Sequence, residues 1–120
     1  MTEEKYINEN FLLKSDLAVA LFHSAAKDLP LLDYHNHLNP TDLATNRKFR
    51  NIADAWVLTD PYKHRAMRIC GVPENGITGN APEKKKFMNW AATVPKTLGN
   101  PLFLWNALEL KRVFGIDEFL

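Results

Sequence analysis

The fold is decided by ten residues, Leu31-Leu32-Asp33-Tyr34-His35-Asn36-His37-Leu38-Asn39-Pro40. An apolar start after a proline, followed by a polar run that ends at a second proline, is typical of a short buried strand. Side chains alternate between the two faces of a strand, so Asp33, His35 and His37 are expected on one face. If that face points into a barrel, both imidazoles lie at its carboxyl end, where barrels bind metals and substrates.

The spacing of the two histidines permits more than one interpretation. Zinc takes three or four protein ligands, and His35 and His37 supply only two. The other interpretation is a pair of ordinary exposed or core histidines. Asp33, one layer further into the strand, is either an acceptor for an imidazole N–H or a buried structural carboxylate.

The composition is that of one folded unit with a modest core. The chain has 120 residues, 46% of them hydrophobic and 24% charged, with a net charge of +1. This balance argues against nucleic acid or an anionic membrane surface as a partner. No apolar run reaches the roughly 20 residues that span a bilayer. The single cysteine, Cys70, excludes an internal disulfide, and the polar N-terminus lacks a secretory signal, so we expect a cytoplasmic location.

A first helix is predicted for residues 16–27. Ser15 is a suitable N-cap, and Pro30 excludes the helix from the residues just before the strand. The apolar side follows a helical repeat, formed by Leu17, Ala20, Leu21, Ser24 and Ala25.

Caps and prolines predict further helices after the strand. Residues 41–44 form a capped helical turn, Asn51 caps a short segment, and Asp60-Pro61 begins a helix that ends near Cys70 and Gly71. Residues 74–80 are predicted to form an exposed loop.

Two more helices follow this loop. The first begins near Glu83, with a buried face made by Phe87, Trp90, Ala91 and Val94. The second begins at Asn100-Pro101 and ends at Phe114-Gly115, with helical spacing of Leu102, Trp105, Leu108, Glu109 and Arg112. One strand among so many helices needs partner strands, because a lone strand cannot pair its own backbone N–H and C=O groups. The chain is therefore expected to be part of something longer.

Several motifs cover nearly the whole chain, namely Asn10-Phe11-Leu12-Leu13, Ala26-Lys27-Asp28-Leu29-Pro30, Asp33-Tyr34-His35-Asn36-His37-Leu38, Arg65-Ala66-Met67-Arg68, Gly71-Val72, Ile77-Thr78-Gly79, Thr93-Val94-Pro95-Lys96-Thr97-Leu98-Gly99-Asn100-Pro101-Leu102 and Leu108-Glu109-Leu110-Lys111-Arg112. Together these motifs resemble the N-terminal part of the uronate isomerase family, a divergent branch of the amidohydrolase superfamily.

The resemblance implies an α/β fold, namely the N-terminal portion of a (β/α)8 TIM-type barrel, here mostly α-helical with one strand. Residues 1–40 would supply the N-terminal helix and first barrel strand, and residues 41–120 a helical insertion that borders the active site. The implied reaction converts glucuronate to fructuronate, or galacturonate to tagaturonate, in bacterial sugar-acid catabolism. Family members are much longer, and a homo-oligomer is compatible with the resemblance.

The resemblance also assigns site residues. His35 and His37 would be ligands to a divalent metal, for which zinc is the favoured ion, and Tyr62 would contact the uronate substrate. The remaining catalytic groups would lie beyond residue 120, so the site in this chain is expected to be incomplete.

This sequence departs from the family pattern at five positions, none of them in the histidine pair. The departures are Asn36 for a cysteine, Pro61 for a histidine, His64 for a tryptophan, and Leu104 and Ala107 for histidines.

Other charged groups receive structural interpretations. Arg65 and Arg68 share a helix face and would suit a uronate carboxylate, but a solvated ridge, or pairing with Asp60 or Glu109, is favoured. His23 and His64 are interpreted as structural. Lys84-Lys85-Lys86 is interpreted as a solvated face, and Cys70 as a packed thiol.

Two other functions remain as alternatives to the isomerase. One is a non-catalytic helical module for binding or structure. The other is a fragment of a metal-dependent amidohydrolase, because His-x-His also follows the first strand of hydrolytic members. The motifs outside the histidines favour the isomerase.

Overall fold

The computed structural model describes residues 5–120, and helices are its only regular elements over that range. The chain divides into two compact units, Met1–His35 and Asn36–Leu120, which are described separately. No helix in the described part of the chain is both long and apolar enough to cross a membrane.

The first unit contains α1 (Asp16–Leu21), which continues into the π-helix η1 (Phe22–Ala26). The Ser15 hydroxyl accepts a hydrogen bond from the backbone N–H of Ala18, as expected of an N-cap. Lys27 N–H donates to the carbonyl of Phe22, five residues back, and this wider spacing defines a π-turn. The predicted N-cap and helix are therefore confirmed.

The strand predicted within residues 31–40 is not formed, since no part of residues 5–120 is β-strand. The segment is irregular and its backbone bonds to nearby side chains: His35 N–H donates to Asp33 Oδ1 at 3.0 Å, and Leu38 N–H to Asn36 Oδ1 at 2.5 Å. Leu31 is 95% exposed and Tyr34 is 97% exposed. The prediction was wrong for this chain because residues 5–120 contain no second strand that could pair with the segment.

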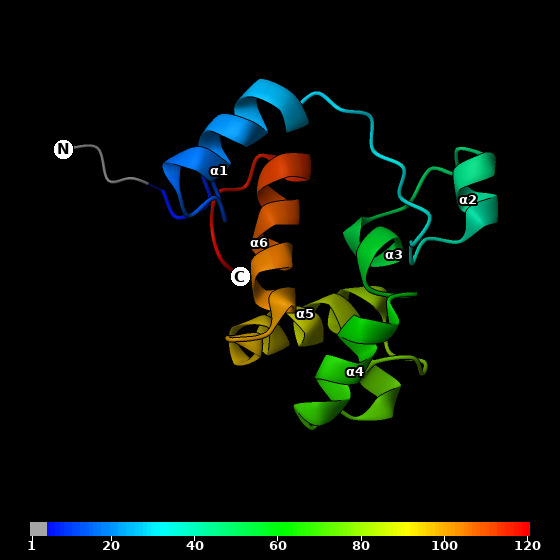
Figure 1. Ribbon diagram of the computed structural model, residues 1–120. Helices are drawn as coiled ribbons and strands as arrows, with labels where there is room; N and C mark the ends of the chain where they lie inside the picture. The colour runs from blue at the N-terminus through cyan, green and yellow to red at the C-terminus, as the bar shows by residue number, and fades with distance from the viewer. Residues whose placement is uncertain (1–4) are drawn as a thin grey trace. The chain divides into compact units, whose positions relative to one another are not determined.

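The second unit is built from helices that begin where the sequence predicts (Figure 1). Their bounds are α2 (Pro40–Ala44), α3 (Ile52–Trp56), α4 (Pro61–Ile69), the 3₁₀ turn η2 (Glu74–Gly76), α5 (Glu83–Thr93), the 3₁₀ turn η3 (Val94–Thr97) and α6 (Pro101–Phe114). Asn39, Asn51, Asp60 and Asn100 each accept a backbone N–H as N-caps. Gly115, with φ 68°, ends α6 in the left-handed conformation that glycine adopts readily.

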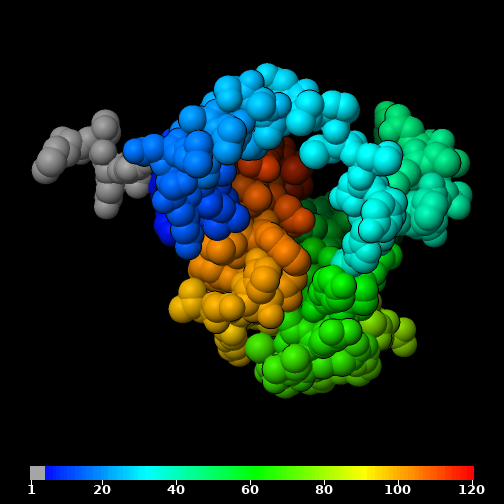
Figure 2. Space-filling model, in the orientation of Figure 1, coloured from blue at the N-terminus to red at the C-terminus, as the bar shows by residue number. Residues whose placement is uncertain are grey.

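The core of this unit lies between α3, α4 and α5. Its fully buried members are Val57, Met67, Ile77, Trp90 and Val94. In the space-filling view the green atoms of α3 and α4 lie directly against the yellow and orange atoms of the helices that follow (Figure 2).

Two burial details differ from the sequence pattern. Ile77 lies in the predicted exposed loop but is fully buried. The turn η2 is fixed by Asn89, whose amide donates to the carbonyl of Gly76 at 3.0 Å, and this places Ile77 in the core. On α6 the buried residues are Asn106, Ala107 and Leu110, whereas Trp105, which the helical spacing included, is 53% exposed.

An ion-pair network holds the segment before α3. Asp54 accepts from Arg47 at 2.9 Å and from Arg50 at 3.1 Å, and Arg50 also reaches Glu83 at the start of α5. The hydrogen bond from Arg50, together with the one from Arg47, lowers the pKa of Asp54 to about 2. Asp54 is thus a carboxylate at neutral pH, which explains how a charged group can be buried on a short helix.

Candidate functional site

The start of α4 fixes the residues of the candidate site. Asp60 precedes Pro61, and its extended backbone (φ −82°, ψ 108°) is the conformation that a following proline favours. Its Oδ1 accepts from the backbone N–H of Tyr62 at 2.9 Å and from that of Lys63 at 3.0 Å. The local sequence therefore fixes the start of the helix, and with it the positions of Asp60, Tyr62 and Lys63.

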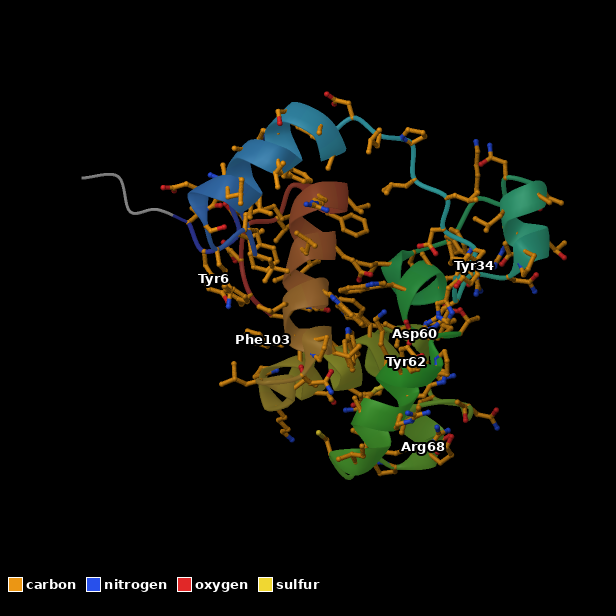
Figure 3. All side chains as sticks on the ribbon, in the orientation of Figure 1. Tyr6, Tyr34, Asp60, Tyr62, Arg68 and Phe103 are labelled. Carbon is orange, nitrogen blue, oxygen red and sulfur yellow. The ribbon has the colours of Figure 1, made fainter. Side chains whose placement is uncertain are left out.

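The second oxygen of Asp60 faces two cationic or ionisable groups. Oδ2 lies 2.8 Å from Lys63 Nζ and 3.3 Å from His37 Nδ1. The ring of Tyr62 meets the imidazole of His37 edge to face, with 4.6 Å between centroids. We call these four residues, His37, Asp60, Tyr62 and Lys63, the Asp60 cluster. Figure 3 shows Asp60 and Tyr62 together at the beginning of α4.

Two tryptophan rings of the second unit contact the Lys63 side chain of the Asp60 cluster. The Lys63 side chain is 7% exposed, and its Nζ lies 5.0 Å from the centroid of Trp56 and 5.8 Å from that of Trp90. An ammonium over an aromatic face is attracted by the ring quadrupole, and the attraction is stronger when water is excluded. Trp56 in turn donates its indole N–H to Glu109 of α6. Through Lys63 the Asp60 cluster therefore packs against the hydrophobic core.

The charge state of Asp60 follows from opposing effects. Burial raises the pKa of Asp60, but hydrogen bonds from the Lys63 ammonium and backbone N–H, the positive charge of Lys63 and a smaller contribution from His37 outweigh it and lower the pKa below its usual value. At neutral pH the group is a carboxylate that can only accept hydrogen bonds.

The structure brings together two of the three site residues that the resemblance assigned. His37 and Tyr62 are in direct ring contact within the second unit. His35 belongs to the first unit, and its backbone is held by Asp33. Asp60 and Lys63 were not predicted as site residues. A signal was present, since an aspartate N-cap three residues before a lysine on the same helix predicts an ion pair.

The arginines of α4 have structural partners. Arg68 binds Glu74 through two nitrogens, at 2.8 and 2.6 Å. These hydrogen bonds are the main cause that lowers the pKa of Glu74 to about 2. Pairing was predicted, but with Asp60 or Glu109 and not with Glu74. The guanidinium of Arg65 lies 5.7 Å from the centroid of Tyr62, at the edge of the Asp60 cluster.

Two other histidines have local roles. His64 is buried, and its Nε2 lies 2.8 Å from the carbonyl oxygen of Val57, which joins α4 to the end of α3. His23 contacts the amide oxygen of Asn10 within the first unit. The burial and backbone contact of His64 agree with its structural interpretation, and that of His23 stays a prediction.

The described residues do not form a metal site by themselves. Residues 5–120 contain no group of three or more His, Cys, Asp or Glu side chains placed to hold one ion. The imidazoles of His35 and His37 are suitable zinc ligands, because histidine commonly binds zinc, but a complete site would need further ligands from outside this chain.

Known proteins with similar sequences and structures match this chain along nearly its whole length. Uronate isomerase of Shouchella clausii is 53% identical over 119 residues, which are 99% of this chain and 25% of that protein. Uronate isomerase of Solibacter usitatus is 56% identical over 115 residues, covering 96% and 25% respectively. The crystal structure of uronate isomerase from Thermotoga maritima superposes with a TM-score of 0.87 at 38% identity, covering 98% of this chain and 26% of that one.

The chain thus spans about a quarter of the length of the relatives it matches. At this TM-score the chain shares the fold of the corresponding part of the Thermotoga maritima protein. Residues 3–120 match the family described as "UxaC: Glucuronate isomerase", and with this match over nearly its full length the chain belongs to that family.

Proposed function

We propose that this chain is the N-terminal part of an enzyme that interconverts aldose and ketose uronates, glucuronate with fructuronate and galacturonate with tagaturonate. The observation that carries the proposal is the identity of about half the residues, over nearly the whole chain, to proteins named uronate isomerase. The complete activity belongs to a protein that contains this chain together with the remaining three quarters of the relatives' length.

In such a protein we propose that the segment within residues 31–40 becomes the first strand of a (β/α)8 barrel. Leu31, Leu32 and Tyr34 are almost fully exposed in the described chain. Exposed apolar residues of this kind, interrupted here only by Asp33, would be buried if the segment became a strand inside a parallel sheet. Neighbouring strands would pair the backbone groups that now bond to Asp33 and Asn36.

His35 and His37 are proposed as two ligands of a divalent metal, with zinc favoured. A bound divalent cation would polarise the sugar carbonyl next to the carbon that loses its proton. His37 supplies an imidazole whose ring is already fixed by Asp60 and Tyr62. The third and later ligands would come from the part of the protein outside this chain.

The metal assignment predicts a loss of bound ion. Replacing His35 and His37 with alanine in the longer protein should abolish stoichiometric metal binding, measured by elemental analysis after purification. His23→Ala is the matched control, because His23 contacts Asn10 and is not part of the proposed site. Unchanged metal content in the double variant would refute the assignment.

Tyr62 is proposed to contact the substrate, and the surroundings of its side chain support this. Tyr62 is 39% exposed, and its ring lies against His37 with the Arg65 guanidinium nearby. The phenol can donate a hydrogen bond to a sugar oxygen, and the arginine adds positive charge for an anionic substrate. Isomerisation also requires a base near C2, which we place outside this chain.

A weaker alternative is hydrolysis by a metal-dependent amidohydrolase. The family match and the names of the relatives favour isomerisation. We also propose a cytoplasmic location, because a lone cysteine with no disulfide partner suits a reducing compartment.

The function is tested by incubating the longer protein with glucuronate, galacturonate and, as a control for the carboxylate requirement, glucose. We expect formation of the ketose from one or both uronates and no conversion of glucose. Equal conversion of glucose, or no ketose from either uronate, would contradict the proposed function.

A further inference from the structure

The atom of His37 that faces Asp60 is Nδ1, at 3.3 Å from Oδ2. An ionised carboxylate has no hydrogen to donate, so a favourable contact requires that Nδ1 carry the proton. In a neutral imidazole only one ring nitrogen is protonated, and the lone pair is then on Nε2. The contact therefore favours one of the two tautomers of His37.

Asp60 is itself held in place by three other donors. Its Oδ1 accepts from the backbone N–H groups of Tyr62 and Lys63, and its Oδ2 accepts from Lys63 Nζ at 2.8 Å. Lys63 is buried between Asp60 and the rings of Trp56 and Trp90. The carboxylate therefore presents Oδ2 to His37 from a fixed position at the end of a helix.

A second contact fixes the plane of the imidazole. Tyr62 meets it edge to face, with an interplanar angle of 77° and 4.6 Å between centroids. This geometry is a preferred one for aromatic pairs. Since Tyr62 and Asp60 belong to the same turn of chain, one helix start determines both the orientation and the tautomer of His37.

We propose that Asp60 is a positioning residue, which holds His37 in the Nδ1–H tautomer so that Nε2 is the nitrogen available to act as a ligand. The proposal rests on the proposed metal role of His37 and deepens it. A histidine that binds a metal usually donates its other ring N–H to a carboxylate or carbonyl, and loss of that partner typically weakens metal binding by about 10–100-fold.

Asp60→Asn separates this role from helix capping. Asparagine is as good an N-cap as aspartate, so its Oδ1 can still accept from Tyr62 and Lys63. Its NH₂ group then replaces Oδ2 and presents hydrogens to His37, which favours the opposite tautomer with an unprotonated Nδ1. The Lys63 ammonium also loses its acceptor in this variant, so the same measurement is made on Asp60→Asn combined with Lys63→Met, in which no buried charge remains. Asn100→Ala is the control for lost capping, because Asn100 caps α6 and bonds the backbone N–H of Leu102.

The test is ¹⁵N NMR of the histidine side chains in the 120-residue chain, at a pH where imidazoles are neutral. We expect an Nδ1–H signal for His37 in the unaltered chain and in Asn100→Ala, and its loss in Asp60→Asn. An Nε2–H tautomer in the unaltered chain, or an Nδ1–H tautomer that persists in Asp60→Asn, would overturn the proposal.

A second measurement distinguishes this inference from the metal assignment. In the longer protein, Asp60→Asn should weaken zinc affinity by about 10–100-fold, whereas Asn100→Ala should leave it unchanged. If His37→Ala lowers zinc affinity but Asp60→Asn does not, the positioning role fails and the ligand assignment stands. If the tautomer changes as expected but His37→Ala retains full zinc affinity, the ligand assignment fails, and with it the use of Asp60 in positioning a ligand.

Discussion

Replacing Trp90 with alanine is expected to lower the free energy of unfolding of this chain by about 3–5 kcal/mol. Trp90 is fully buried at the centre of the core formed by Val57, Met67, Ile77 and Val94. The substitution removes a large apolar surface and leaves a cavity that the surrounding helices can fill only in part. It also removes the indole N–H that bonds to Asn106 at 3.2 Å.

Urea unfolding followed by circular dichroism measures this loss, and Trp105→Ala is the matched control. Trp105 is 53% exposed on α6, so the same chemical change should cost much less there, about 1 kcal/mol or below. Equal losses for the two tryptophans would show that the core is not centred on Trp90.

Replacing Lys63 with methionine is expected to cost about 3–5 kcal/mol, because it leaves the Asp60 carboxylate partly buried without its ammonium partner. The two side chains are 7% and 13% exposed, with 2.8 Å between Nζ and Oδ2. Methionine keeps much of the length and apolar stem of lysine, so packing against Trp56 is disturbed less than the charge balance.

The double variant Lys63→Met with Asp60→Asn should recover much of that loss, since no buried charge then remains. Lys111→Met is the control, because Lys111 pairs with Asp117 at the surface, where an ion pair contributes about 0–1 kcal/mol. Unfolding free energies from the same urea experiment give all three values. A Lys63→Met loss no larger than that of Lys111→Met would mean that the Asp60 and Lys63 pair adds little to stability.

The helix starts could be predicted from the sequence because they depend on neighbouring residues. Ser15, Asn51, Asp60 and Asn100 each bond a backbone N–H two or three positions ahead, and no distant residue is needed. The same locality explains why Gly115 ends α6 where the sequence predicts.

Features that depend on distant residues were missed or wrong. Ile77 is buried because Asn89, twelve residues later, binds the preceding turn. The strand predicted within residues 31–40 requires partner strands, and the segment cannot supply them itself. The candidate site was partly predictable, since the resemblance assigned His37 and Tyr62, but the contact of Asp60 with His37 joins positions 23 residues apart.

The most direct test of the central claim compares two proteins in one assay of ketose formation from glucuronate. One is the isolated 120-residue chain, and the other contains it together with the remaining length of its relatives. We expect steady conversion by the longer protein and none above background by the isolated chain, because His35, His37 and Tyr62 form only part of the proposed site. Conversion by the isolated chain, or inactivity of the longer protein toward glucuronate and galacturonate alike, would contradict the claim.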